Sequence, residues 1–145
     1  METNEHMRKH DERCETIGLL TKLEEYITDE TNDSLYYYRL AELAPEEEDR
    51  SIILGFARDE AMHASNFKIL YRLLTGTVPP EPVVVEPQIE DFEEGVERRI
   101  LAESGDFRKY AMDYVEYHEP PVCDLFYLTS VAEGQHAMRL TLFLN

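Results

Sequence analysis

Two Glu-x-x-His motifs stand out among the residues of this chain that are able to do chemistry. Glu60 and His63 form the first motif, and Glu133 and His136 form the second. Residues three apart share one face of a helix, so each motif presents a carboxylate and an imidazole side by side. Together these groups suit iron or manganese as a bound metal. Taken alone, however, such a motif is more often a solvated pair or a hydrogen-bonded core histidine.

The two motifs belong to an internal repeat whose equivalent positions are 73 residues apart, as positions 60 and 133 are. The same offset relates Glu30 to Glu103 and Tyr37 to Tyr110. Each half therefore has one glutamate that is followed, thirty residues later, by a Glu-x-x-His motif. Such repetition indicates that the two halves form equivalent parts of one structure.

The repeated polar residues fall on the apolar stripes of four amphipathic segments. Along each stripe, the spacing between neighbouring members alternates between three and four residues. The stripes are Ile27, Glu30, Ser34, Tyr37, Ala41 and Ala44; Ile53, Phe56, Glu60, His63, Phe67, Leu70 and Leu74; Val96, Ile100, Glu103, Phe107, Tyr110 and Tyr114; and Phe126, Thr129, Glu133, His136, Leu140 and Phe143.

Glutamates at these positions would be buried while negatively charged. No Lys or Arg lies on the stripes to pair with them, and burying unpaired carboxylates is strongly unfavourable. The compensating cations must then come from outside the chain. Two divalent ions would balance four carboxylates, and two neutral imidazoles would complete the ligand set. We therefore predict a dinuclear metal site formed by Glu30, Glu60, His63, Glu103, Glu133 and His136.

The segments that carry the stripes predict four long helices, at about residues 14–44, 46–74, 89–117 and 121–144. Alternating spacings of three and four are typical of near-parallel helix packing, so we expect an all-α four-helix bundle. Residues 1–13 are polar and are expected to form a flexible N-terminal tail, with the bundle in residues 14–145.

A proline-rich linker at residues 75–88 separates the second expected helix from the third. Its four prolines exclude a helix and favour an extended chain. At about 3.1 Å per residue, about 15 extended residues span about 46 Å. A helix of about 29 residues is about 43 Å long. The linker is therefore long enough to return the chain along a whole helix, which predicts one long crossover between the second and third helices.

The composition restricts the classes of partner. A net charge of −17 argues against binding to nucleic acid or to an anionic membrane surface. No apolar run approaches the length of a membrane span, and the N-terminus lacks the apolar segment of a signal peptide. We expect a cytoplasmic protein that contacts neither nucleic acid nor membrane.

Four segments resemble motifs of the ferritin-like superfamily, and within it of the rubrerythrin-like group. These segments are ETNDSLYY from residue 30, DEAMH from residue 59, ESGDFRKY from residue 103 and EGQH from residue 133. The resemblance covers about residues 15–144. It implies a bundle with two iron ions that oxidises Fe(II) with hydrogen peroxide or dioxygen.

The resemblance also implies a role for each ligand. Glu60 and Glu133 would bridge the two metal ions. Glu30 and Glu103 would be terminal ligands together with the two histidines, and which histidine shares a metal ion with which glutamate stays open. In rubrerythrins, the carboxylate three residues after the third-helix ligand moves with the oxidation state of iron. That position here is Asp106, one methylene shorter than the usual glutamate.

Three further residues near the ligands are of interest. Tyr37 and Tyr110 lie on the same stripes as the ligands, and either hydrogen-bond to ligand carboxylates or only pack in the core. Gly105 follows Glu103 closely inside an expected helix. It marks a kink or a π-bulge beside the site, or is simply a tolerated glycine.

The resemblance suggests two protein partners. Rubrerythrins often carry a rubredoxin domain, but the two cysteines, Cys14 and Cys123, cannot form a CxxC pair and the sequence ends at Asn145. We therefore expect an external electron donor such as a rubredoxin-like protein. A homodimer is also expected, through an apolar outer face that includes Ile52, Ile69 and Leu73.

Two other functions remain open from the sequence. One is non-catalytic binding or storage of iron. The other is a structural bundle whose site holds manganese or zinc. Turnover with peroxide would separate catalysis from both, and metal content would separate iron from manganese or zinc.

Overall fold

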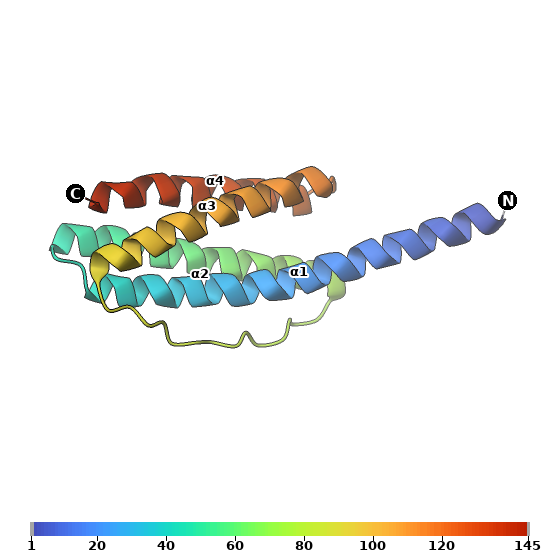
Figure 1. Ribbon diagram of the computed structural model, residues 1–145. Helices are drawn as coiled ribbons and strands as arrows, with labels where there is room; N and C mark the ends of the chain where they lie inside the picture. The colour runs from blue at the N-terminus through green and yellow to red at the C-terminus, as the bar shows by residue number, and fades with distance from the viewer. Residues whose placement is uncertain (1, 145) are drawn as a thin grey trace.

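The computed structural model describes residues 2–144, except for the side chains of residues 2–4, 6 and 14. The described residues form four α-helices and no strand (Figure 1). The helices are α1 (Glu2–Glu42), α2 (Glu47–Thr75), α3 (Phe92–Glu116) and α4 (Val122–Leu140), and a 3₁₀ turn, η1 (Thr141–Phe143), follows α4. The expected all-α four-helix bundle is therefore confirmed. None of the four described helices is both long and apolar enough to cross a membrane.

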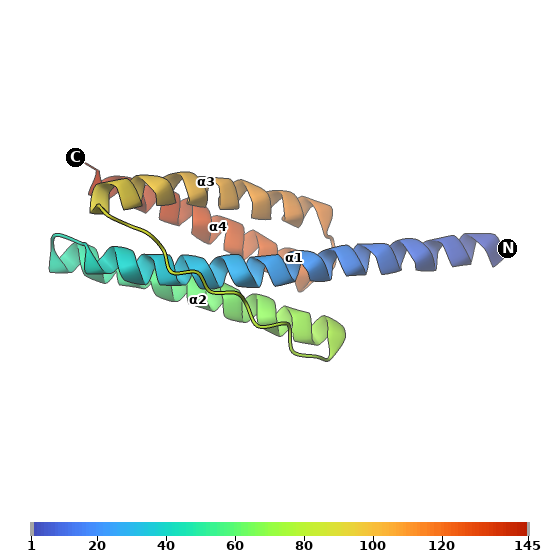
Figure 2. The same ribbon diagram turned by 60° about the horizontal axis from the view of Figure 1, so that its bottom comes forward.

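The helices are arranged as two antiparallel hairpins, α1 with α2 and α3 with α4 (Figures 1 and 2). The segment between α2 and α3 runs along the outside of the first hairpin and returns the chain to its opposite end (Figure 2). Asn32 on α1 holds this segment, because its amide donates to the carbonyl of Val83 at 2.9 Å and accepts from the backbone N–H of Val85 at 2.7 Å. The long crossover is thus as expected.

Local chemistry explains where α2 ends and where α3 begins. At the end of α2, Gly76 adopts a φ of 71°, and its N–H donates to the carbonyl of Arg72. A residue without Cβ adopts this left-handed backbone readily. At the start of α3, the side chain of Asp91 accepts from the N–H of Glu94 at 3.0 Å, which caps the helix.

The start of α1 differs from the expectation. Residues 1–13 are expected to form a flexible tail because they are polar, whereas α1 begins at Glu2 and extends beyond the other helices (Figure 1). The segment contains neither Gly nor Pro, and Lys9 pairs with Glu5 one turn before it, which favours a helix. Residue 13 is therefore not a boundary of secondary structure, and Met1 and the side chain of Cys14 lie outside the described residues.

Two apolar clusters form the core on either side of a polar layer. The first includes Leu23, Ile27, Phe67, Tyr110 and Phe126, which come from all four helices. The second, towards the opposite end of the bundle, consists of Tyr37, Leu40, Ala41, Ile53, Phe56, Ala57, Val96 and Leu140. This arrangement shields the middle of the bundle from water at both ends.

The predicted inward face of α3 was partly wrong. Phe107 and Tyr114 are 46% and 44% exposed, whereas Arg99 and Asp113 are 6% and 3% exposed. The aromatic and the charged residues both fit the helical period, and apolar character favours the aromatic ones. In addition, α3 is an unbroken α-helix, with no π-bulge at Gly105.

Candidate metal centre

The six predicted ligands meet in the middle of the bundle. Each helix contributes to the cluster: α1 provides one glutamate, α3 another, and α2 and α4 each provide one Glu-x-x-His pair. All six side chains are buried. They form two groups, in each of which the ligand atoms lie within 4.8 Å of one another: Glu30, Glu60, His63 and Glu133; and Glu60, Glu103, Glu133 and His136.

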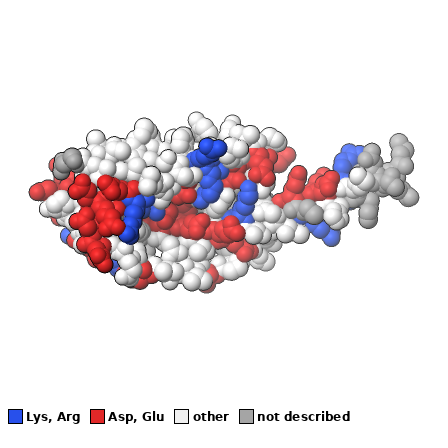
Figure 3. Space-filling model, in the orientation of Figure 1, with Lys and Arg blue, Asp and Glu red and all other residues white. Residues whose placement is uncertain are grey.

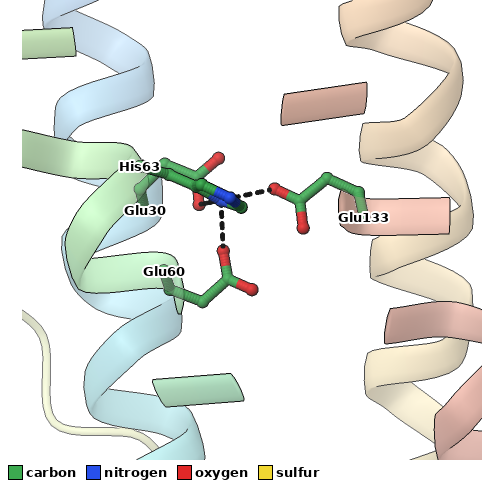
Figure 4. Close-up of side chains that lie close together, drawn as sticks. All are labelled: Glu30, Glu60, His63 and Glu133. Carbon is green, nitrogen blue, oxygen red and sulfur yellow. Dashed lines mark hydrogen bonds and ion pairs between the residues drawn. The ribbon is translucent and has the colours of Figure 1, made fainter. Parts of the chain in front are cut away.

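His63 lies at the centre of the first group (Figure 4). Its Nδ1 atom is 3.2 Å from Oε2 of Glu60 and 3.2 Å from Oε1 of Glu133. Oε2 of Glu30 is slightly farther from Nδ1, at 3.5 Å. The first hairpin thus supplies three members of the group, and α4 supplies the fourth from across the bundle.

His136 occupies the corresponding place in the second group. Its Nδ1 atom is 2.8 Å from Oε1 of Glu60 and 3.2 Å from Oε2 of Glu133. Oε2 of Glu103 lies 3.7 Å from the same nitrogen.

Glu60 and Glu133 belong to both groups and present a different oxygen to each histidine. Each of these carboxylates therefore contacts both groups. Glu30 lies in the group of His63, and Glu103 lies in the group of His136.

The pKa values follow from burial and from mutual contacts. Burial raises the pKa of Glu60 to about 8 and that of Glu133 to about 9. Burial opposes ionisation of Glu30 as well, but its contacts with His63, Glu60 and Tyr110 together outweigh burial, and its pKa is lowered. The pKa of His136 is raised to about 12 because its contacts with carboxylates outweigh burial. The cluster thus limits its charge by binding protons, which a divalent cation would displace.

Several buried atoms of the cluster lack hydrogen-bond partners among the described residues. Buried polar atoms in proteins nearly always have such a partner. Here, carboxylate oxygens and an imidazole nitrogen converge on one interior region without hydrogen-bonding geometry. This donor set fits divalent cations with oxygen and nitrogen ligands. The atoms without a partner are Oε2 of Glu30, Oε1 of Glu60, Oε2 of Glu103, both Oε atoms of Glu133 and Nδ1 of His136.

Two buried tyrosines hold the terminal glutamates across the halves of the repeat. The hydroxyl of Tyr37 on α1 donates to Oε1 of Glu103 on α3 at 2.5 Å. The hydroxyl of Tyr110 on α3 donates in turn to Oε1 of Glu30 on α1. Each bond fixes one carboxylate oxygen and leaves Oε2 directed towards the cluster. The two tyrosines therefore both pack in the core and orient the predicted ligands.

Asp59 has a role that the sequence analysis missed. Its Oδ2 atom lies 2.9 Å from Nε2 of His136. When the ring is neutral, a proton on Nε2 in this hydrogen bond leaves the lone pair of Nδ1 available to a cation held by the carboxylates. Its position directly before Glu60 in the DEAMH segment was the only available signal.

Arg99 corrects the expectation that no cation lies on the stripes. It is buried, and its guanidinium donates to Oε1 of Glu103 at 2.7 Å and to Oδ1 of Asp33 at 2.8 Å. Residues four apart on a helix are neighbours, so its position relative to Glu103 was a signal. Ile100, the residue expected to face inward at this turn of α3, is only partly buried.

Asp106 pairs with a lysine and belongs to neither ligand group. Its Oδ1 atom accepts from Nζ of Lys109 at 2.9 Å, and the side chain is partly buried. The structure therefore places this residue beside the cluster, with a cation as its partner.

Negative charge also dominates the outer surface. Asp and Glu side chains cover much of the face shown in Figure 3, and Lys and Arg are fewer. The sequence as a whole has a net charge of −17. Such a surface attracts cations over a distance set by ionic strength.

No protein-family model, no curated protein and no solved structure matches the chain. The structure itself is a four-helix all-α bundle with buried Glu and His clusters that are consistent with a ferritin-like dinuclear metal site.

Proposed function

We propose that this protein binds two iron ions in the buried cluster and oxidises Fe(II) with hydrogen peroxide or dioxygen. The observation that carries the proposal is the pair of ligand groups that share Glu60 and Glu133. Two shared carboxylates between two histidine-containing groups match the ligand pattern of dinuclear carboxylate bundles. A bound iron pair would supply the redox chemistry, and the protein would supply geometry and shielding from water.

The six cluster residues would have different roles in binding the two ions. Glu60 and Glu133 would bridge the two ions, and Glu30 with His63 and Glu103 with His136 would complete the two coordination spheres. Four carboxylates and two divalent ions leave no net charge to bury, which accounts for glutamates inside an apolar bundle. Thiolates are missing from this set, which favours iron or manganese over zinc.

Proton movement within the cluster belongs to the proposed mechanism. Glu60 and Glu133 retain protons at neutral pH because burial raises the pKa of both. These protons leave when cations bind. The tyrosine hydroxyls keep their protons, because burial raises the pKa of Tyr37 and Tyr110 well above the usual value. Both hydroxyls therefore act as hydrogen-bond donors that hold the terminal carboxylates.

The proposal includes partners outside the chain. Repeated turnover with peroxide needs a reductant, for which we propose an external donor of the rubredoxin-like class in the cytoplasm. A homodimer through the outer face of α2 is the proposed assembly. Ile69 and Leu73 on that face are 54% and 70% exposed, whereas Ile52 packs against the second apolar cluster.

The test is anaerobic loading with Fe(II), followed by one equivalent of hydrogen peroxide or by air, with iron content and the optical spectrum as readouts. We expect two iron ions per chain and rapid oxidation. Glu60→Ala and Glu133→Ala should abolish loading, and Glu97→Ala, an exposed glutamate on α3, should leave it unchanged. Two bound ions without oxidation would favour a storage or structural role. Failure of the wild type to bind two ions would refute the site.

A further inference from the structure

The two ligand groups are related by the repeat, but their surroundings differ because of Arg99. Its guanidinium bonds both Glu103, a member of the second group, and Asp33. The Cζ atom also lies 4.9 Å from the ring centroid of Tyr37, a distance that allows a cation–π contact. With an exposure of 6%, this cation is fixed in position from several sides.

The repeat does not supply the same cation to the first group. The position 73 residues before Arg99 is Tyr26, which is uncharged. The hydroxyl of Tyr26 donates to Oδ2 of Asp113 at 2.5 Å, and its ring packs in the first apolar cluster. The residue that matches Arg99 in sequence therefore serves the core and not the ligands.

Lys109 on α3 does not take over this function either. Its Nζ atom donates to Asp106 at 2.9 Å and lies 4.7 Å from the ring centroid of Tyr110. Within residues 2–144, where side chains are described, the only salt-bridge partner of Glu30 is His63. The first group thus has no permanent cation bonded to its terminal glutamate.

The hydrogen bonds of the terminal glutamates differ accordingly. Oε1 of Glu103 accepts from both Tyr37 and Arg99, whereas Oε1 of Glu30 accepts from Tyr110. Bonds from charged donors are roughly twice as strong as neutral ones. They draw carboxylate charge away from a bound metal ion. The guanidinium charge also repels a second cation in the same low-dielectric region.

We propose that Arg99 makes the two metal positions unequal. The position of Glu30 and His63 binds the first divalent ion, and the position of Glu103 and His136 binds the second more weakly. This inference rests on the proposed function only in requiring that the cluster binds divalent cations. Its consequence is ordered loading, in which the position beside Arg99 is the last to fill and the first to empty.

A substitution of Asp33 should change the affinity of the second position in the opposite direction to a substitution of Arg99. Its carboxylate accepts from Arg99 at 2.8 Å and offsets part of the guanidinium charge. Removal of the Asp33 charge therefore increases the effect of Arg99 on the second position. A role of Arg99 in packing alone would not make Arg99→Gln and Asp33→Asn act in opposite directions.

The experiment is an anaerobic titration of the metal-free protein with Co(II) at pH 7.5, by calorimetry and visible absorption. The wild type should bind two ions with Kd values that differ by roughly tenfold or more, the scale of a hydrogen bond to a charged group. Arg99→Gln should bring the two values together, and Asp33→Asn should separate them further. Arg98→Gln removes a neighbouring exposed cation and should match the wild type.

Histidine variants assign the two binding events. His63→Ala should remove the tighter event, and His136→Ala should remove the weaker one. The reverse assignment would overturn the inference, as would two unequal sites that persist unchanged in Arg99→Gln. If circular dichroism shows that Arg99→Gln does not fold, Asp33→Asn decides: a second site that is not weakened overturns the inference. Absence of any Co(II) binding by the wild type would instead refute the proposed function.

Discussion

The effect of Glu133→Gln on the free energy of unfolding should change sign when metal is added. Glu133 is 1% exposed, and burial raises its pKa from 4.5 to about 9. When the pKa of a carboxyl is higher in the folded state, the folded protein loses stability as pH rises from the unfolded-state pKa to the folded-state pKa. At pH 7 the folded chain must take up a proton here, at a cost of about 3 kcal/mol (about 1.4 kcal/mol per pH unit).

The neutral amide has the same shape and avoids that cost. Metal-free Glu133→Gln should therefore be more stable than the wild type by up to about 3 kcal/mol, or about 6–12 °C in Tm for a chain of this size. With saturating metal, Glu133→Gln should instead be less stable than the wild type. A ligand at a hundred times its Kd stabilises the folded wild type by about 3 kcal/mol for each site, and the variant lacks one of the two carboxylates shared by both groups.

The assay is thermal and urea unfolding at pH 7, with and without Mn(II) or Co(II). Glu97→Gln provides a matched control on an exposed position and should show the wild-type response. The reasoning would be refuted if metal-free Glu133→Gln were less stable than the wild type, or if it gained as much stability from metal.

Four further predictions follow from individual contacts. Metal-free wild type should lose stability between about pH 6.5 and 8, because the folded-state pKa values of Glu60, Glu133 and His136 are raised; urea unfolding across this range should show a flat profile if the reasoning is wrong. Tyr37→Phe should cost about 1–3 kcal/mol through its lost bond to a charged group, and unchanged unfolding would contradict this. Asp59→Ala should weaken one of the two metal sites by about 10–100-fold, since it orients His136; calorimetry that finds both sites intact would exclude that role. Phe67→Ala should destabilise the bundle by about 3–5 kcal/mol because the ring is fully buried, and an unaltered Tm would show that the first apolar cluster is not as packed as described.

Much of the fold and the cluster could be predicted because polar residues violate an apolar pattern at a fixed offset. Glu30, Glu60, Glu103 and Glu133 are out of place on buried stripes, and the prolines of the crossover cannot be helical. A pattern of this kind depends only on helical geometry and on the cost of burying charge. The number of helices and the six residues that meet inside the bundle could therefore be predicted from the sequence.

The contacts between the halves could not be read from the repeat. The offset makes Tyr37 equivalent to Tyr110, but only the packed bundle shows that each bonds the glutamate of the opposite half. Arg99 could not be placed because Ile100 fits the period of α3 equally well, and its partners, Glu103 and Asp33, lie on two different helices. Side chains that pair across helices depend on the rotation of each helix, which the sequence period fixes only approximately.

The most direct measurement of the central claim is anomalous diffraction from crystals of the protein grown anaerobically with Fe(II), recorded at the iron edge. The account predicts two strong peaks per chain, separated by the carboxylates of Glu60 and Glu133, with one histidine beside each. A single peak, or peaks confined to the acidic surface with none between the four helices, would contradict it.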